Sequence, residues 1–227
     1  MVEFERKEKY DFNDLRKIMR ILRSPGGCPW DIEQTHRSIR NDFLEEAYEA
    51  IEGIDKNDPV ILREELGDVL LQVVFHSDIS EADGDFSIDD VITDLCQKLI
   101  IRHPHVFSNI EEYQNVNSSE QVLNNWNEIK KQTKGQKTER EELEGISRAL
   151  PSLYRGQKAA KKRRKAGHAV ECDSDTVCEK LKAFEEKTDI DTLGELLYTI
   201  CAAADKAGVD AEEALYKKIE EKINEVG

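Results

Sequence analysis

The chain has 227 residues, enough for one large domain or two small ones with a buried core. Its formal net charge of −15 argues against general nucleic-acid binding and against attraction to an anionic membrane surface. Five cysteines without a CxxC pair argue against a disulfide framework, and without a membrane-length apolar run or a secretion signal we expect a soluble cytoplasmic protein.

Helical periodicity dominates the first half of the chain. Asp58 followed by Pro59 is a typical helix start, and Ser87 and Asp90 have the spacing of a capping box. The run SPGGCPWDIEQT at 24–35 is predicted to end the first helix and form a loop. We predict helices over residues 12–23, about 35–54, 59–80, 87–103 and 118–133.

The second half begins with a polar, non-periodic stretch, residues 134–146, that we interpret as a linker. Helical patterns follow over residues 147–166, 174–186, 190–207 and 211–225. Since nothing alternates long enough for a sheet, the predicted fold class is all-α, with an N-terminal helical domain at 1–133 and a C-terminal one at 147–227. The run LGDVLL at 66–71 recurs as LGELLY at 193–198, so the C-terminal domain is predicted to be an altered second copy.

Four carboxylates occupy matching positions on the second and third predicted helices. Glu46 and Glu49 precede Asn57, and Glu65 and Asp68 follow it, each beside an apolar stripe. If the hairpin turns at Asn57, Glu46 faces Asp68 and Glu49 faces Glu65. All four side chains then share one face, in two levels about 4.5 Å apart.

This set of carboxylates indicates a metal site. Like charges repel in a partly desolvated site, and a divalent cation removes the repulsion. All-oxygen ligands favour Mg²⁺, with Mn²⁺ as a possible substitute. An EExxE run alone is common on surface helices, so the matching ExxD carries the prediction. A di-iron bundle needs two Glu-x-x-His motifs, and the chain offers one, Glu33 with His36.

Five stretches in order resemble the MazG family of nucleoside triphosphate pyrophosphohydrolases, over about 27–165. They are GCPWD with QT at 27–35, EEAYE at 45–49, EELGDVLLQVVF at 64–75, Lys98 with RHPHVF at 102–107, and LPxLxRxQK at 150–158. The resemblance implies an all-α MazG-like helical bundle that dimerises. It also implies Mg²⁺-dependent hydrolysis of NTPs and dNTPs to the monophosphate and pyrophosphate.

The resemblance also implies roles for individual residues. The metal ligands are Glu46, Glu49, Glu65 and Asp68, with Glu45 a further member of the motif. Glu45 or another of these carboxylates is expected to orient the attacking water or accept its proton. Two further groups are candidates for substrate binding: Lys98 and Arg102, four residues apart on one helix face, for phosphate, and Trp30 for stacking on the base.

The second copy departs from this pattern. Aligning Gly67 with Gly194 puts Thr192 at the position of Glu65 and Glu195 at that of Asp68. The counterparts of Glu46 and Glu49 are Lys180 and Ala183. We therefore expect the C-terminal copy to be catalytically silent and to serve packing or dimerisation.

Alternatives to a general pyrophosphohydrolase remain open. One is a narrower all-α pyrophosphatase, dUTPase-like or phosphoribosyl-ATP pyrophosphatase-like. The other is a non-catalytic helical interaction module. The basic run 161–165 is interpreted as a solvated helix face, so no nucleic-acid or membrane partner is expected.

Overall fold

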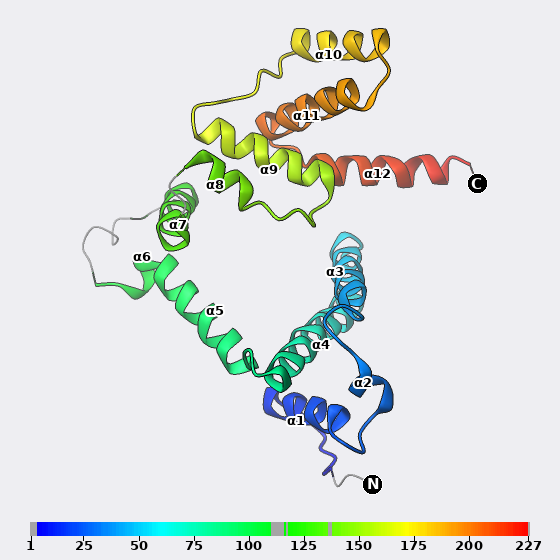
Figure 1. The fold of residues 1–227 in the computed structure, drawn as a ribbon, viewed down its shortest axis with the longest axis vertical. Coiled ribbons are helices and arrows are strands. Elements are labelled where there is room, and N and C mark those ends of the chain that lie inside the picture. The colour runs from blue at the N-terminus through cyan, green and yellow to red at the C-terminus, as the bar shows by residue number, and fades with distance from the viewer. Residues whose placement is uncertain (1–3, 110–115, 117, 136–137, 227) are drawn as a thin grey trace. The chain divides into compact units, whose positions relative to one another are not determined.

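The computed structural model describes residues 4–109, 116, 118–135 and 138–226 (Figure 1). Within these ranges the secondary structure is helical and contains no strand, which confirms the all-α prediction. The chain divides into two compact units, Met1–Val116 and Asn117–Gly227, and each is described by itself. No helix in the described ranges is long and apolar enough to cross a membrane.

The first unit contains six helices in its described residues. They are α1 (Phe12–Arg23), α2 (Pro29–Glu33), α3 (Arg40–Asp55), α4 (Pro59–Asp83), α5 (Ile88–Arg102) and α6 (Pro104–Phe107). The described part of the second unit contains α7 (Ser119–Lys134), α8 (Glu139–Glu144), α9 (Ser152–Lys165), α10 (Ser174–Glu186), α11 (Ile190–Ala207) and α12 (Ala211–Asn224).

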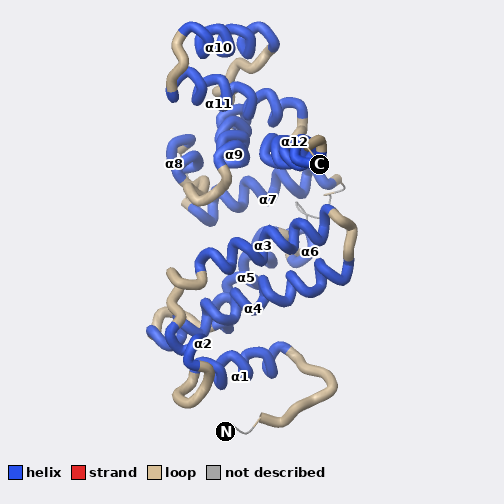
Figure 2. The backbone as a smooth tube through the Cα atoms, turned by 90° about the vertical axis from the view of Figure 1, so that its right-hand side faces the viewer, coloured by secondary structure: helices blue, strands red, loops and turns tan. Residues whose placement is uncertain are grey.

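Helices α3 and α4 form the hairpin that was predicted to turn at Asn57 (Figure 2). Asn57 has a φ of +51°, and the Asp58 side chain caps α4 by accepting the backbone N–H groups of Val60 and Ile61. Gly53 is required here, because a Cβ atom at this position would lie 2.9 Å from the backbone nitrogen of Leu62. The two helices therefore approach closely beside the turn.

Helix α1 and the second half of α4 enclose the core of the first unit. Its buried side chains are Met19, Ile39, Val74, Phe75 and Ile79. Ion pairs add to this packing, since Arg23 Nε lies 2.8 Å from Asp78 Oδ2 with both side chains largely buried. The α1–α4 contact therefore supports the far end of the hairpin.

Several helix boundaries differ from the sequence prediction. Helix α3 begins at Arg40 and not near Thr35, because the Ser38 hydroxyl bonds to Gln34 and to the Thr35 carbonyl and so favours a turn over residues 36–39. Helix α4 continues through Asp83 to a left-handed Gly84. Residues 29–33 of the predicted loop form α2.

The predicted linker also contains ordered structure. Thr138 and Glu141 form a capping box that starts α8 inside residues 134–146. The division between the compact units falls before α7, which lies in the second unit, and the domains 1–133 and 147–227 stay predictions.

The apolar stripes of α3 and α4 are only partly buried. Ala50 is buried, whereas five members of the predicted stripes are more than a third exposed: Phe43, Ile51, Ile54, Leu66 and Leu70. Two helices can bury only the sides that face each other, so much of the apolar surface of the hairpin stays accessible within this chain.

The basic run on α9 is not simply solvated. Lys162 pairs with Glu142 at 3.6 Å and Arg164 with Asp205 at 2.8 Å. Arg163 pairs with Glu139 at 3.5 Å. Acidic side chains of α8 and α11 therefore neutralise three of its five cations.

Candidate metal centre

Three of the predicted carboxylates converge on one point. Glu46 and Glu49 on α3 and Glu65 on α4 each offer a carboxylate oxygen, and these oxygens lie within 4.8 Å of one another. Glu46 and Glu65 are half-buried and Glu49 is exposed. The hairpin therefore brings together acidic side chains from the helix before Asn57 and the helix after it.

The charges in this cluster follow the predicted register. Burial raises the pKa of Glu46, and among the neighbouring charges Asp68 raises it most. Burial likewise raises the pKa of Glu65, and the largest charge contribution comes from Glu49. The largest charge contributions therefore come from Asp68 on Glu46 and from Glu49 on Glu65. These are the pairs expected from a turn at Asn57.

Asp68 and Glu45 lie outside the group of three converging oxygens. Asp68 is half-buried and acts on both Glu46 and Glu65 through its charge. Glu45 is exposed and also raises the pKa of Glu46. Asp42 contributes in the same way and was missed from the sequence, although it lies one turn before Glu46 on the same face of α3.

The donor set suits a hard divalent cation. All of its ligand atoms are carboxylate oxygens, and burial together with the neighbouring negative charges raises the pKa of Glu46 and Glu65. Oxygen-only ligands match the preference of Mg²⁺ and Mn²⁺. The residues present therefore fit a divalent metal.

The second copy replaces this cluster with an ion pair. At the positions of Glu46 and Asp68 stand Lys180 and Glu195, whose Nζ and Oε2 atoms lie 3.3 Å apart. Thr192, at the position of Glu65, bonds through its hydroxyl to the carbonyl of Lys187 at 2.6 Å. At these aligned positions the second unit therefore has no group of converging carboxylates.

Trp30 lies on α2, and the residue is 57% exposed. One side of the indole contacts Phe75, with ring centroids 6.3 Å apart. Arg23 fixes α2 by donating to the carbonyl of Asp31, and its guanidinium lies 5.0 Å from the centre of the Phe75 ring. The indole thus has a supported edge and an accessible surface, which suits a stacking role.

Lys98 and Arg102 lie on α5, which packs against α4 and α6. Lys98 is exposed and Arg102 is half-buried. Both residues lie on a different helix from the carboxylates, which are on α3 and α4. Their role in binding phosphate remains a prediction.

A histidine pair joins the segment before α3 to α4. The Nδ1 atoms of His36 and His76 lie 2.7 Å apart, and His36 Nε2 lies 3.1 Å from the hydroxyl oxygen of Ser80. Burial and the neighbouring His36 lower the pKa of His76. The pair fixes the turn over residues 36–39 against α4, a role that the single Glu-x-x-His motif did not indicate.

An all-α chain with carboxylates converging on an antiparallel hairpin has the donor set and the arrangement that a divalent-metal site in a helical protein requires. The comparisons define the family more closely. The profile of the MazG nucleotide pyrophosphohydrolase domain matches residues 34–107, which include all four predicted ligands.

Relatives match over most of the chain. The nucleoside triphosphate pyrophosphohydrolase/pyrophosphatase MazG of Thermotoga maritima is 38% identical over 95% of this chain and 88% of its own length. The nucleoside triphosphate pyrophosphohydrolase of Escherichia coli K12 is 35% identical over 93% and 85%, respectively. The uncharacterized protein YabN of Bacillus subtilis is 44% identical over 67% of this chain, but the match spans only 30% of YabN. The chain therefore belongs to the MazG family.

Proposed function

We propose that this protein hydrolyses nucleoside triphosphates, NTPs or dNTPs, to the monophosphate and pyrophosphate at the carboxylates of the α3–α4 hairpin. The observation that carries the proposal is the convergence of Glu46, Glu49 and Glu65 on one point. The Thermotoga maritima and Escherichia coli relatives are named as nucleoside triphosphate pyrophosphohydrolases, which supports the same substrate class.

Glu46, Glu49 and Glu65 would hold Mg²⁺, with Asp68 beside them as the fourth ligand and Mn²⁺ as a possible substitute. A bound cation would neutralise phosphate charge and lower the pKa of a coordinated water. The triphosphate is strongly negative, and the carboxylates alone would repel it. Binding of substrate therefore depends on the cation and on nearby basic side chains.

The remaining residues bind and orient. Lys98 and Arg102 would donate hydrogen bonds to phosphate oxygens, which compensates the charge of the acidic cluster. Trp30 would stack on the base, and since every base has an aromatic face this contact tolerates several nucleotides. Glu45, exposed next to Glu46, would accept the proton of the attacking water.

We further propose that the active form is a homodimer. The exposed apolar side chains of α3 and α4 continue on α5, where Leu95, Leu99 and Ile101 are also more than a third exposed. A patch of this kind on a soluble chain indicates a protein interface. A second copy would cover the hairpin of the first.

The second unit is proposed to be a silent copy that serves packing. Its Lys180–Glu195 ion pair stands where the first unit has two acidic side chains.

The five cysteines are all unpaired, which fits the predicted cytoplasmic location.

The test is an activity assay. Purified protein with Mg²⁺ is incubated with a panel of NTPs and dNTPs, and nucleoside monophosphate, pyrophosphate and orthophosphate are quantified. We expect equal amounts of monophosphate and pyrophosphate. Turnover of a single nucleotide would favour the narrower pyrophosphatase, orthophosphate release would contradict the proposed bond, and no turnover would favour the non-catalytic interaction module.

A further inference from the structure

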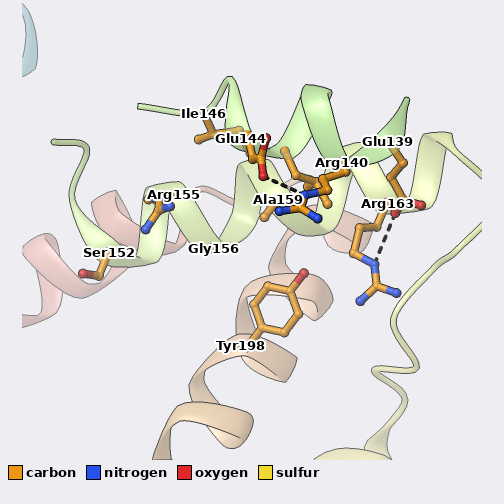
Figure 3. Close-up of a pocket in the computed structure, with 11 residues that line it drawn as sticks. Glu139, Arg140, Glu144, Ile146, Ser152, Arg155, Gly156, Ala159, Arg163 and Tyr198 are labelled. Atoms are coloured by element: carbon orange, nitrogen blue, oxygen red, sulfur yellow. Dashed lines mark hydrogen bonds and ion pairs between the residues drawn. The ribbon is translucent and has the colours of Figure 1, made fainter. Parts of the chain in front are cut away.

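The second unit contains a cavity that the proposed hydrolysis does not use. It has a volume of 690 Å³ and is lined by residues of α8, α9 and α11 and of the segment joining α8 to α9 (Figure 3). This volume falls within the range of small-molecule sites, about 300–1,000 Å³. The cavity lies entirely within the second unit, whereas the carboxylate cluster lies in the first.

Close packing of α9 on α11 shapes one wall of the cavity. A Cβ atom on Gly156 would lie 3.1 Å from the sulfur of Cys201 and 3.8 Å from the ring of Tyr198. Because glycine allows this approach, Tyr198 extends from α11 toward α9 beside the cavity (Figure 3). Leu143 and Ile146 add apolar surface to the lining.

Three arginines line this cavity, and one of them has no acidic partner. Arg140 pairs with Glu144 at 2.8 Å, and Arg163 pairs with Glu139 at 3.5 Å. The side chain of Arg155, from the LPxLxRxQK stretch, has neither an ion pair nor a hydrogen bond within the described part of the chain. This side chain is exposed, so its guanidinium is accessible to an anion.

Two neutral donors accompany Arg155 in the lining. The hydroxyl groups of Ser152 and Tyr198 also lack a hydrogen-bond partner among the described residues. Ser152 precedes Arg155 by one helical turn on α9. The Arg155 guanidinium presents two parallel N–H groups and Ser152 one hydroxyl, a set that can serve the terminal oxygens of a phosphate monoester, while the Tyr198 hydroxyl lies farther along the cavity, on the side of Arg163 (Figure 3).

We propose that this cavity binds a phosphorylated small molecule of nucleotide size, with its phosphate on Arg155 and Ser152 and with Tyr198 farther along the lining. The apolar part of the ligand would pack on Leu143 and Ile146. The second unit would then bind a ligand although its carboxylate site is lost. The phosphate could belong to a nucleoside monophosphate or be free in solution, and the test separates these sources.

The experiment is a binding titration of the full chain in EDTA, which suppresses metal-bridged binding at the carboxylates. The probes are AMP, inorganic phosphate and adenosine, followed by calorimetry and by amide chemical shifts. We expect AMP to bind with a Kd below about 1 mM and to shift amides of α9 and α11. Adenosine, which lacks the phosphate, should not bind.

Variants locate the site. Arg155→Ala should weaken binding at least about tenfold, since a charge-assisted contact is lost. Lys161→Ala removes the same charge from an exposed position on the same helix outside the cavity and should leave the Kd unchanged. Tyr198→Phe deletes one hydroxyl and should weaken binding less than Arg155→Ala does.

Each outcome decides. AMP binding much more tightly than phosphate supports a nucleotide ligand, and equal affinities that both depend on Arg155 support free phosphate. No binding of either, or equal weakening by Arg155→Ala and Lys161→Ala, would overturn the proposal. Hydrolysis by the first unit is measured separately, so its presence or absence does not affect this result.

Discussion

The Nζ atom of Lys180 lies 3.3 Å from Oε2 of Glu195, at the positions that Glu46 and Asp68 occupy in the first unit. The aligned residues therefore face each other in both hairpins. In the first unit both residues are acids, and the charge of Asp68 raises the pKa of Glu46. In the second unit one residue is a base and the other an acid. The ammonium group of the second hairpin supplies the positive charge that the first is proposed to take from a metal.

Restoring acidic side chains should rebuild a metal site in the second unit. Lys180→Glu, Ala183→Glu and Thr192→Glu together recreate the set present in the first hairpin. Glutamate at position 192 suits the helix start, because Thr192 already forms a capping box with Asp189 and glutamate is a preferred residue at that third position. We expect one additional bound Mn²⁺ per chain, counted by electron paramagnetic resonance. An unchanged stoichiometry in a folded variant would contradict the equivalence of the two hairpins.

Neutralising a ligand should abolish hydrolysis without unfolding the hairpin. Glu46→Gln, Glu49→Gln or Glu65→Gln keeps the side-chain shape but removes a charge from the proposed metal centre. We expect kcat to fall at least about 100-fold, since several kcal/mol of charge stabilisation are lost. Circular dichroism should be unchanged.

Glu52→Gln is the matched control for these variants. It makes the same change on the same helix, at an exposed residue that pairs with Lys56. Activity should stay within about twofold, because exposed ion pairs of this type contribute about 0.3–0.5 kcal/mol. A large loss of activity here would show that the effect is not specific to the cluster.

The pKa shifts in the cluster predict how stability responds to pH. Because the pKa values of Glu46 and Glu65 are raised in the folded state, the folded protein holds more protons than the unfolded chain across the carboxyl range. These two groups therefore lower the stability of the metal-free protein as pH rises through that range. In EDTA at pH 7, Glu46→Gln should raise the Tm.

Low pH and added Mg²⁺ should each change the comparison between Glu46→Gln and the unsubstituted chain. Well below the unperturbed carboxyl pKa, both proteins are protonated or neutral at this position, and the Tm gain should disappear. With Mg²⁺ at pH 7, the unsubstituted chain should gain more stability than Glu46→Gln does. A lower Tm for Glu46→Gln in EDTA would contradict the raised pKa.

The exposed apolar face of the hairpin should mediate dimerisation. Ile51 on α3 is 49% exposed, and Ile51→Glu places a charge in the proposed interface. We expect light scattering to show a monomer with unchanged helix content. Ile190, 88% exposed in the second unit, provides the control, since Ile190→Glu should leave the mass unchanged. A monomeric unsubstituted chain would exclude the homodimer.

Local signals in the sequence predicted much of the fold. The helix starts at Asp58 and Ser87 were found from capping residues, and both caps are formed as expected. The boundaries that differ, at Thr35 and at Ser80, depend on hydrogen bonds of Ser38 and on the left-handed Gly84. Helical periodicity does not contain this information, because polar side chains that compete for the backbone end a helix without changing its apolar pattern.

The candidate site divides in a similar way. The pairing of Glu46 with Asp68 follows from counting residues about Asn57, because a tight antiparallel hairpin relates its two helices by a fixed axis. That Asp68 lies outside the three converging oxygens depends on where each side chain points. The His36–His76 contact and the cavity beside Arg155 join residues from separate elements, which spacing along one helix cannot predict.

By itself, the sequence determined an all-α chain, the register of its first hairpin and the loss of acids in its second, because periodicity, capping and residue type are local properties. Only the tertiary structure decided which carboxylate oxygens converge, that Lys180 reaches Glu195, and that Arg155 lines a cavity. These facts depend on distances between side chains of different helices, and packing alone sets those distances.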